Sequence, residues 1–295
     1  ALGAPLPTGV PPAPQSVDPA PPDVAPGLSG QVEAFLGASK WGRYDRVTAV
    51  LVNVDGAAVT EYRRPDLPES PREVTGVTAA VLVALVGILL ERGELGADGL
   101  AGVRQPLERL LPAPLPEPLA AAGGTRLHDL LVGTSVGDVA ALSAVLTAAT
   151  GRPVPDLARE LLFGPLGIDP PWTGAGPAVS AQDMARLGAL WLDRGSVGGR
   201  QLVPAAWIDT TTRPYAETGR RRLPYAGYRQ WVTRAGGHTA NVFTGDDAQL
   251  VEVVPGLGLV VVVASAPDPD PEVAIPASSE AFVEMVDSVI VPGLG

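Results

Sequence analysis

Residues 77–90 form the stretch that most constrains how this chain can fold. Their single polar residue is Thr78, and the charged pair Glu91-Arg92 and then Gly93 follow directly, as at the end of a helix with a glycine stop. A helix that is apolar nearly all round must be buried on every side, and this one is too short to cross a bilayer comfortably. The sequence therefore predicts a central helix over residues 77–92 with further layers wrapped around it.

The ends of the chain differ in composition. Residues 1–27 contain nine prolines and no apolar periodicity, which predicts a flexible, partly extended tail. With 46% hydrophobic residues in 295, the remainder, residues 28–295, is expected to form one domain. The first residue is Ala1, so we expect a removed signal peptide or lipoprotein anchor and a secreted or cell-envelope location, with no transmembrane segment left.

Charge and cysteine content exclude several classes of function. The net charge is −11, and the only basic run is Arg220-Arg221-Arg222, so neither nucleic acid nor an anionic membrane surface is an expected partner. The absence of cysteine excludes disulfides, thiolate nucleophiles and cysteine zinc sites. Two distant histidines and the Asp246/Asp247 pair do not form a recognised ligand set, so no metal and no cofactor are expected.

Strand-like periodicity is confined to the two ends of the domain. Asp55-Gly56 joins two apolar runs, residues 47–54 and 57–62, and predicts a tight hairpin. Four more strands are predicted over residues 228–232, 241–244, 249–254 and 257–264.

Helical periodicity fills the middle and both ends of the domain. Ser180 with Asp183 resembles a capping box, and Pro204 opens a further helix. Helices are predicted over residues 28–36, 127–132, 138–150, 154–163, 181–194 and 279–290. The order of elements predicts an α+β sandwich: a central antiparallel sheet with the terminal helices on one face and a helical lobe on the other.

Four scaffold segments carry a resemblance to a known family. Residues 161–168, 180–186, 199–207 and 254–262 resemble segments of the serine β-lactamase and penicillin-binding-protein superfamily, in its class C β-lactamase, esterase and D-alanyl-D-alanine carboxypeptidase branch. They occur in the right order and span roughly residues 28–290. The resemblance implies a β-lactamase-like fold and, for active members, peptidoglycan or small ester and amide substrates.

The first functional motif of that family is degenerate. Its Ser-x-x-Lys tetrad, nucleophile and base, corresponds to Gly76-Val77-Thr78-Ala79. Neither Gly76 nor Ala79 can attack a carbonyl or accept a proton. The only lysine is Lys40, with Gly37 three residues before it, so the chain contains no Ser-x-x-Lys at all.

The other two motifs are also lost. Thr134-Ser135-Val136 lies where the resemblance places Tyr-x-Asn or Tyr-x-Ser, in a region that is shortened here. The Lys-Thr-Gly-type motif corresponds to residues 245–249, of which only Gln249 persists. Asp246 and Asp247 would repel a ligand carboxylate if they faced the cleft, although strand alternation lets only one of them do so.

These observations favour a catalytically inactive relative, a pseudoenzyme with no catalytic residues. It would bind a protein or a peptidoglycan-related ligand through a remnant cleft, for which the candidates are Ser135, Asp246, Asp247, Gln249 and His238. A third hypothesis is that the chain is a decayed gene product with no retained function.

The enzyme alternative is a serine hydrolase with Ser135 as a relocated nucleophile. His128 or His238 would serve as its base, and Asp138 or Asp247 would orient that base. Residues 133–137 also match the Gly-x-Ser-x-Gly elbow of α/β hydrolases, but that motif needs a preceding strand and residues 127–132 are predicted to be helical.

Overall fold

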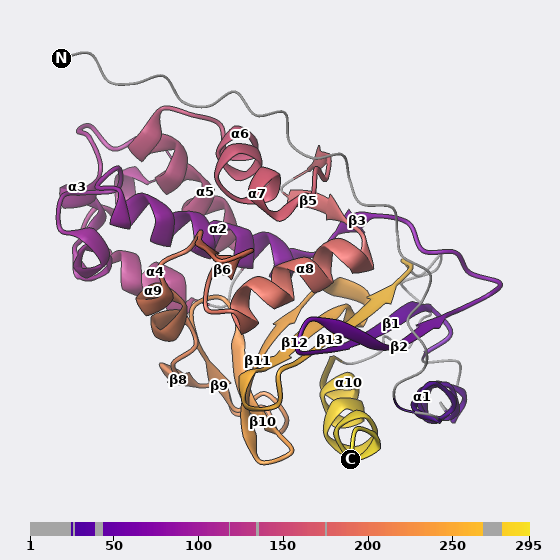
Figure 1. The fold of residues 1–295 in the computed structure, drawn as a ribbon. Helices are drawn as coiled ribbons and strands as arrows, with labels where there is room; N and C mark the ends of the chain where they lie inside the picture. Colours follow the sequence, from indigo (N-terminus) through magenta and orange to yellow (C-terminus); the bar gives the residue numbers. More distant parts are fainter. Residues whose placement is uncertain are drawn as a thin grey trace.

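A computed structural model describes residues 25, 27–38, 44–117, 119–133, 136–174, 176–267 and 279–295. Its main feature is an eight-stranded antiparallel sheet in the order β2-β1-β13-β12-β11-β10-β9-β8, with helices on both faces (Figure 1). The strands are β1 Val47–Val54, β2 Ala57–Arg63, β8 Ala216–Glu217, β9 Tyr225–Ala226, β10 Trp231–Ala235, β11 His238–Thr244, β12 Leu250–Val254 and β13 Leu259–Ser265. This confirms the predicted α+β class and the antiparallel sheet.

The first hairpin forms as its turn sequence predicts. Val54 pairs with Ala57, and the two residues between them adopt positive φ, 49° at Asp55 and 78° at Gly56. Such a turn matches the twist of the flanking strands. Two smaller sheets lie outside the main one and consist of β3 Arg72–Glu73, β5 Gly176–Val179 and β4 Trp172–Thr173, and of β6 Ser196–Val197 and β7 Arg200–Gln201.

The main sheet is buried on both faces because its central strands are apolar throughout. Along β13, Val260 and Val262 belong to one hydrophobic cluster and Val261 and Val263 to another. Successive side chains of a strand point to opposite faces, so the two clusters lie on the two sides of the sheet.

The terminal helices cover one face, as predicted. α1 Leu28–Gly37 contacts β2, and α10 Ser279–Met285 contacts β12. In Figure 1 both lie below the sheet, near the C-terminus. A π-helical segment, η7 Val286–Ile290, and α11 Val291–Gly293 complete the C-terminal layer.

The helical lobe covers the other face around α2 Thr75–Glu91, the predicted central helix. Every residue of α2 from Gly76 to Leu90 is buried. Trp207 packs against Gly87 and donates from Nε1 to the carbonyl oxygen of Val83 at 2.8 Å. The other elements of this lobe are η2 Gly99–Arg104, α3 Leu107–Leu110, η3 Ala120–Ala122, α4 Leu127–Val132, α5 Val136–Thr150, α6 Val154–Ala158, η4 Arg159–Phe163, α7 Gly164–Leu166, α8 Ala181–Leu192 and α9 Ala205–Thr211.

One strand prediction was wrong in its position. The strand predicted over residues 228–232 begins only at Trp231 and runs on to Ala235. The preceding residues turn: the amide of Gly227 donates to the carbonyl of Gln230 at 2.8 Å, and Arg229 has a φ of 57°. Alternation of apolar residues does not reveal a residue with left-handed backbone conformation.

The predicted tail, residues 1–27, lies almost entirely outside the described residues. Among the helices that are described, none has both the length and the apolar character to span a bilayer.

Candidate functional site

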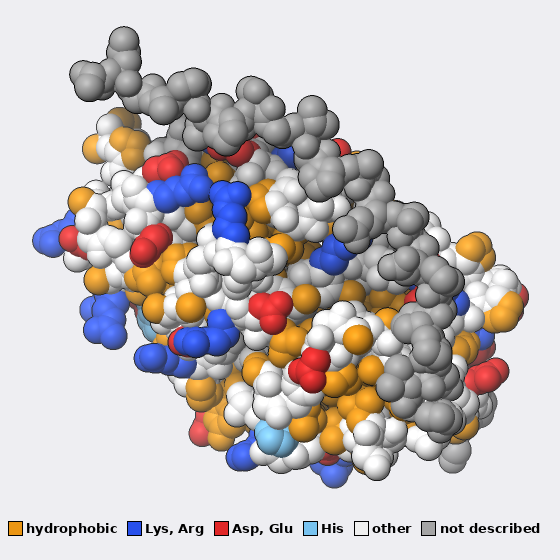
Figure 2. Space-filling model, viewed as in Figure 1, with side chains coloured by type: hydrophobic (Ala, Val, Ile, Leu, Met, Phe, Trp, Pro, Cys, Tyr) orange, Lys and Arg blue, Asp and Glu red, His pale blue; other side chains and the backbone are white. Residues whose placement is uncertain are grey.

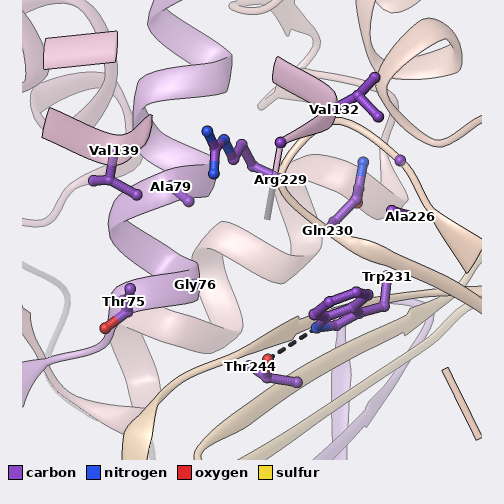
Figure 3. Close-up of a pocket in the computed structure, with 12 residues that line it drawn as sticks. Thr75, Gly76, Ala79, Val132, Val139, Ala226, Arg229, Gln230, Trp231 and Thr244 are labelled. Carbon is purple, nitrogen blue, oxygen red and sulfur yellow. Dashed lines mark hydrogen bonds between the residues drawn. The ribbon is translucent and has the colours of Figure 1, made fainter. Parts of the chain in front are cut away.

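A pocket of about 140 Å³ opens where the first turn of α2 meets the start of β10 and the end of β11 (Figure 3). Its wall combines the first turn of a buried helix, the end of α4, the turn before β10 and the end of β11. The lining residues are Thr75, Gly76, Ala79, Val132, Gly133, Val139, Ala226, Gly227, Arg229, Gln230, Trp231 and Thr244. Of the three degenerate positions predicted from the sequence, Gly76 and Ala79 therefore share one pocket with the end of β11, and Thr134 lies outside the described residues.

Gly76 lies directly against the backbone of β11. A β-carbon added at Gly76 would come within 2.7 Å of the amide nitrogen of Thr244 and closer still to its carbonyl oxygen. Real β-carbon contacts below 3.0 Å are essentially absent, and backbone atoms cannot swing aside as a side chain can. The position that the resemblance assigns to a nucleophilic serine therefore accepts only glycine in this arrangement.

Among the described residues of the pocket wall, Arg229 has the only ionisable side chain. In Figure 3 its guanidinium extends towards Ala79 on α2, the position that the resemblance assigns to the basic lysine. Its Nη2 donates to the carbonyl oxygen of Leu130 at 2.7 Å, and its amide donates to the carbonyl oxygen of Leu131 at 3.0 Å. These bonds fix the turn before β10 against the end of α4.

Burial lowers the pKa of the Arg229 guanidinium to about 10, because desolvation disfavours the charged form. A pKa of about 10 still leaves the side chain cationic at neutral pH. The pocket thus contains one partly desolvated positive charge.

Trp231 and Gln230 supply the polar groups on the sheet side. Trp231 Nε1 donates to Thr244 Oγ1 at 3.0 Å, shown as the dashed line in Figure 3, and this bond holds β10 to the end of β11. The buried amide of Gln230 donates to Thr211 Oγ1 at 3.1 Å. The pocket wall is consequently fixed by side-chain hydrogen bonds as well as by the sheet.

The remaining predicted site residues lie elsewhere or outside the described chain. Thr134 and Ser135 are outside the described residues, although the adjacent Gly133 lines the pocket. His238 is exposed at the first residue of the seven-residue strand β11, so about 20 Å of extended strand separates it from Thr244. Gln249 is buried and donates from Nε2 to the carbonyl oxygen of Ser265 at 3.4 Å.

Asp247, a candidate cleft residue, does not face the pocket. This residue has a φ of 55°, and its carboxylate accepts a hydrogen bond from Arg72 Nη2 at 2.7 Å, so it pairs with β3 and does not line the pocket. Nothing is described of the side chain of Asp246. The pocket charge established by the described residues is therefore positive. The sequence did not reveal this charge, because residues 228–232, which include Arg229, are predicted to form a regular strand.

His128 belongs to a different cleft. Its Nδ1 lies 2.6 Å from the hydroxyl of Tyr228, and its ring meets Tyr215 edge-on at 5.0 Å. Within the part of the chain that is described, no cluster of His, Asp or Glu could hold a metal ion.

Comparisons with solved structures show the same fold. The chain is similar to a class C β-lactamase from Rhodobacter sphaeroides, with a TM-score of 0.65, 16% identity, and 91% of this chain and 100% of that one covered. A penicillin-binding protein homologue from Caulobacter crescentus is similar with a TM-score of 0.62 and 13% identity, and the match covers 92% of this chain and 98% of that one. An octameric penicillin-binding protein homologue from Pyrococcus abyssi is similar with a TM-score of 0.62 and 14% identity, and the match covers 87% of this chain and 76% of that one.

No family model matches the sequence, and no curated protein does either. The structural neighbours thus share a β-lactamase-like and penicillin-binding-protein-like fold with this chain. At 13–16% identity that likeness concerns the fold alone.

Proposed function

We propose that this protein is a non-catalytic relative of the serine β-lactamases and penicillin-binding proteins that binds a ligand in the pocket between α2, the start of β10 and the end of β11. The observation that carries the proposal is the contact of Gly76 with the backbone of Thr244, which leaves no space for a nucleophile at that position. The pocket beside it is nevertheless open. A site without its nucleophile and with a preserved cavity suits binding better than turnover.

The ligand that fits this pocket is the carboxylate end of a short peptide of cell-wall origin. Arg229 offers a charge-assisted partner for a carboxylate, and its partial desolvation strengthens that interaction. Apolar lining residues such as Val132 and Val139 suit small aliphatic side chains. The volume, about 140 Å³, suits the terminal residues of a D-alanyl-D-alanine stem and not a whole disaccharide peptide.

The same proposal places the protein outside the cell or at the cell envelope, where peptidoglycan fragments occur. Cell fractionation with an antibody against this chain tests the location, and recovery in the cytoplasmic fraction alone would contradict it.

The hydrolase alternative keeps one favourable observation, because Gly133 lines the pocket and Ser135 follows two residues later. Its candidate bases fit poorly. The imidazole of His128 is engaged with Tyr228, and His238 lies at the far end of β11.

Two measurements test the proposal together. Intact-protein mass spectrometry after incubation with a fluorophosphonate and, separately, with a penicillin is expected to show no adduct. Isothermal titration calorimetry with an acetylated Lys-D-Ala-D-Ala peptide is expected to show binding that weakens at least tenfold in Arg229→Met and stays unchanged in Arg200→Met, an exposed arginine on β7.

A stoichiometric adduct on Ser135 would replace the proposal by the hydrolase alternative. Absence of peptide binding, or equal binding by both methionine variants, would refute the assignment of the pocket as the ligand site.

A further inference from the structure

A second and larger cleft, of about 870 Å³, lies between η2, the start of α4 and the end of α9. Its described lining residues are all different from those of the pocket at Gly76. We infer that this cleft binds a small organic molecule that carries two or more anionic oxygen groups, phosphates or carboxylates. The inference is independent of the function proposed above.

Three arginines from separate parts of the chain converge on the cleft. Arg104 ends η2, Arg126 directly precedes α4, and Arg213 follows α9. No described residue accepts a hydrogen bond or ion pair from any of the three side chains. The described residues that line the cleft include no Asp or Glu, although the chain carries a net charge of −11.

In the basic run noted in the sequence, Arg220-Arg221-Arg222, two of the three arginines form ion pairs. Arg220 pairs with Glu280 at 2.9 Å, and Arg222 pairs with Glu284 at 2.8 Å, both on the C-terminal helix. Arg220 and Arg222 are therefore already paired with carboxylates, whereas the arginines of the cleft, which are dispersed in the sequence, have no such partner among the described residues. Figure 2 shows basic side chains on the left of the molecule, where Figure 1 places α3, α4 and α9.

Two of the arginines interact electrostatically with the same group, the hydroxyl of Tyr228. Burial raises the pKa of its hydroxyl, and the positive charges of Arg104 and Arg213 oppose that shift. Both guanidinium groups are thus close enough to influence the same oxygen. Tyr215 stacks on Tyr228 with ring centroids 4.7 Å apart, so the wall beside the charges is rigid and aromatic.

The chemistry of the wall defines the class of ligand. Converging guanidinium groups repel one another, and an anion with several charges relieves that repulsion better than a monovalent one. Guanidinium groups bind phosphate and carboxylate oxygens in a bidentate manner. Leu100 and Val103 provide an apolar surface for the carbon skeleton, and the cleft volume suits a whole small molecule.

The test is isothermal titration calorimetry of the full chain at fixed ionic strength with inorganic pyrophosphate, with tricarballylate and with acetate. Binding of pyrophosphate, of tricarballylate or of both, with no measurable binding of acetate, supports the inference. The tighter of the two ligands then identifies the phosphate or the carboxylate class. Comparable binding of acetate, or no binding of any of the three, overturns the inference.

Two charge-matched double variants locate the site. R126Q/R213Q is expected to weaken binding of the preferred anion at least tenfold, whereas R200Q/R221Q, which removes two exposed arginines outside the cleft, is expected to change it less than twofold. All four side chains are exposed, so both variants should fold, and thermal melting checks this. Equal weakening in both variants would mean that only net charge matters and would overturn the assignment of the cleft.

Discussion

Gly76 is the residue at which the end of β11 comes so close to α2 that no side chain has room. Gly76→Ala should gain up to about 1 kcal/mol of helix propensity. The added β-carbon would meet the Thr244 backbone, and overpacking of this kind typically destabilises by about 1–3 kcal/mol or more. We therefore expect a net loss of stability in urea denaturation. The matched control is Gly30→Ala in α1, where a β-carbon meets no atom within 4 Å and stability should stay equal or rise.

Glu252 is a buried carboxyl whose environment should make the stability of the protein depend on pH. It is fully buried on β12, and neither carboxyl oxygen bonds to any described residue. Desolvation, and secondarily the charge of Asp287, raise the pKa of this carboxyl well above 4.5. The folded state then binds a proton that the unfolded state has released, so stability is greatest below the unfolded pKa and falls as the pH rises towards the folded one.

Glu252→Leu should remove this pH dependence. Eliminating a buried carboxyl without partners among the described residues should stabilise the protein by about 1–3 kcal/mol at pH 8, with a smaller effect at pH 4.5. Thermal or urea unfolding across this pH range measures the difference. An unchanged pH slope in the variant would contradict the assignment of the slope to Glu252.

At the scale of elements, the start of α8 is the clearest case of a local signal that the structure confirms. Asp183 N donates to Ser180 Oγ at 3.1 Å, and Ser180 N donates to the Asp183 carboxylate at 3.0 Å. Ser180→Ala should therefore destabilise the protein by about 1 kcal/mol. Ser143→Ala, inside α5, is the control; Ser143 only donates to the carbonyl of Val139, and no loss is expected there. Equal losses would argue against capping.

Elements defined by local chemistry were predictable, and elements defined by distant contacts were not. Asp55-Gly56 fixes its hairpin by backbone preference alone, and the apolar run in α2 can only be buried. The position of β10 depends on the turn at Arg229, whose amide donates to Leu131 almost a hundred residues earlier. Neither periodicity nor propensity encodes such a contact.

The same limit applies to the sites at the scale of the whole molecule. The degenerate positions Gly76 and Ala79 could be assigned from the sequence because the resemblance aligns them with the Ser-x-x-Lys tetrad at the start of a recognisable helix. Arg229 was not, because its approach to α2 exists only in three dimensions. In the second cleft, Arg104 and Arg126 are 22 positions apart in the sequence, and Arg126 and Arg213 are 87 positions apart. They therefore form no run of basic residues that sequence analysis could detect.

Whole-molecule architecture also gives a reason to expect no Ser-x-x-Lys chemistry when the first motif is rebuilt. In Gly76→Ser/Ala79→Lys, the serine side chain would displace the end of β11, which is held by pairing with β12 and by Trp231. The lysine would enter a pocket that already contains the Arg229 guanidinium, and the like charge would disfavour both ammonium and guanidinium.

We therefore expect this double variant to show no hydrolysis of nitrocefin or p-nitrophenyl acetate above the wild-type background, together with a lower melting temperature. Adding Arg229→Gly to the double variant removes the competing cation and the side chain at a positive φ, so it should recover part of the melting temperature without turnover. Clear burst-phase acylation by the double variant, detected as a mass adduct on the new serine, would mean that β11 yields more easily than its pairing suggests. The pocket would then be a dormant active site and not a binding site closed to this chemistry.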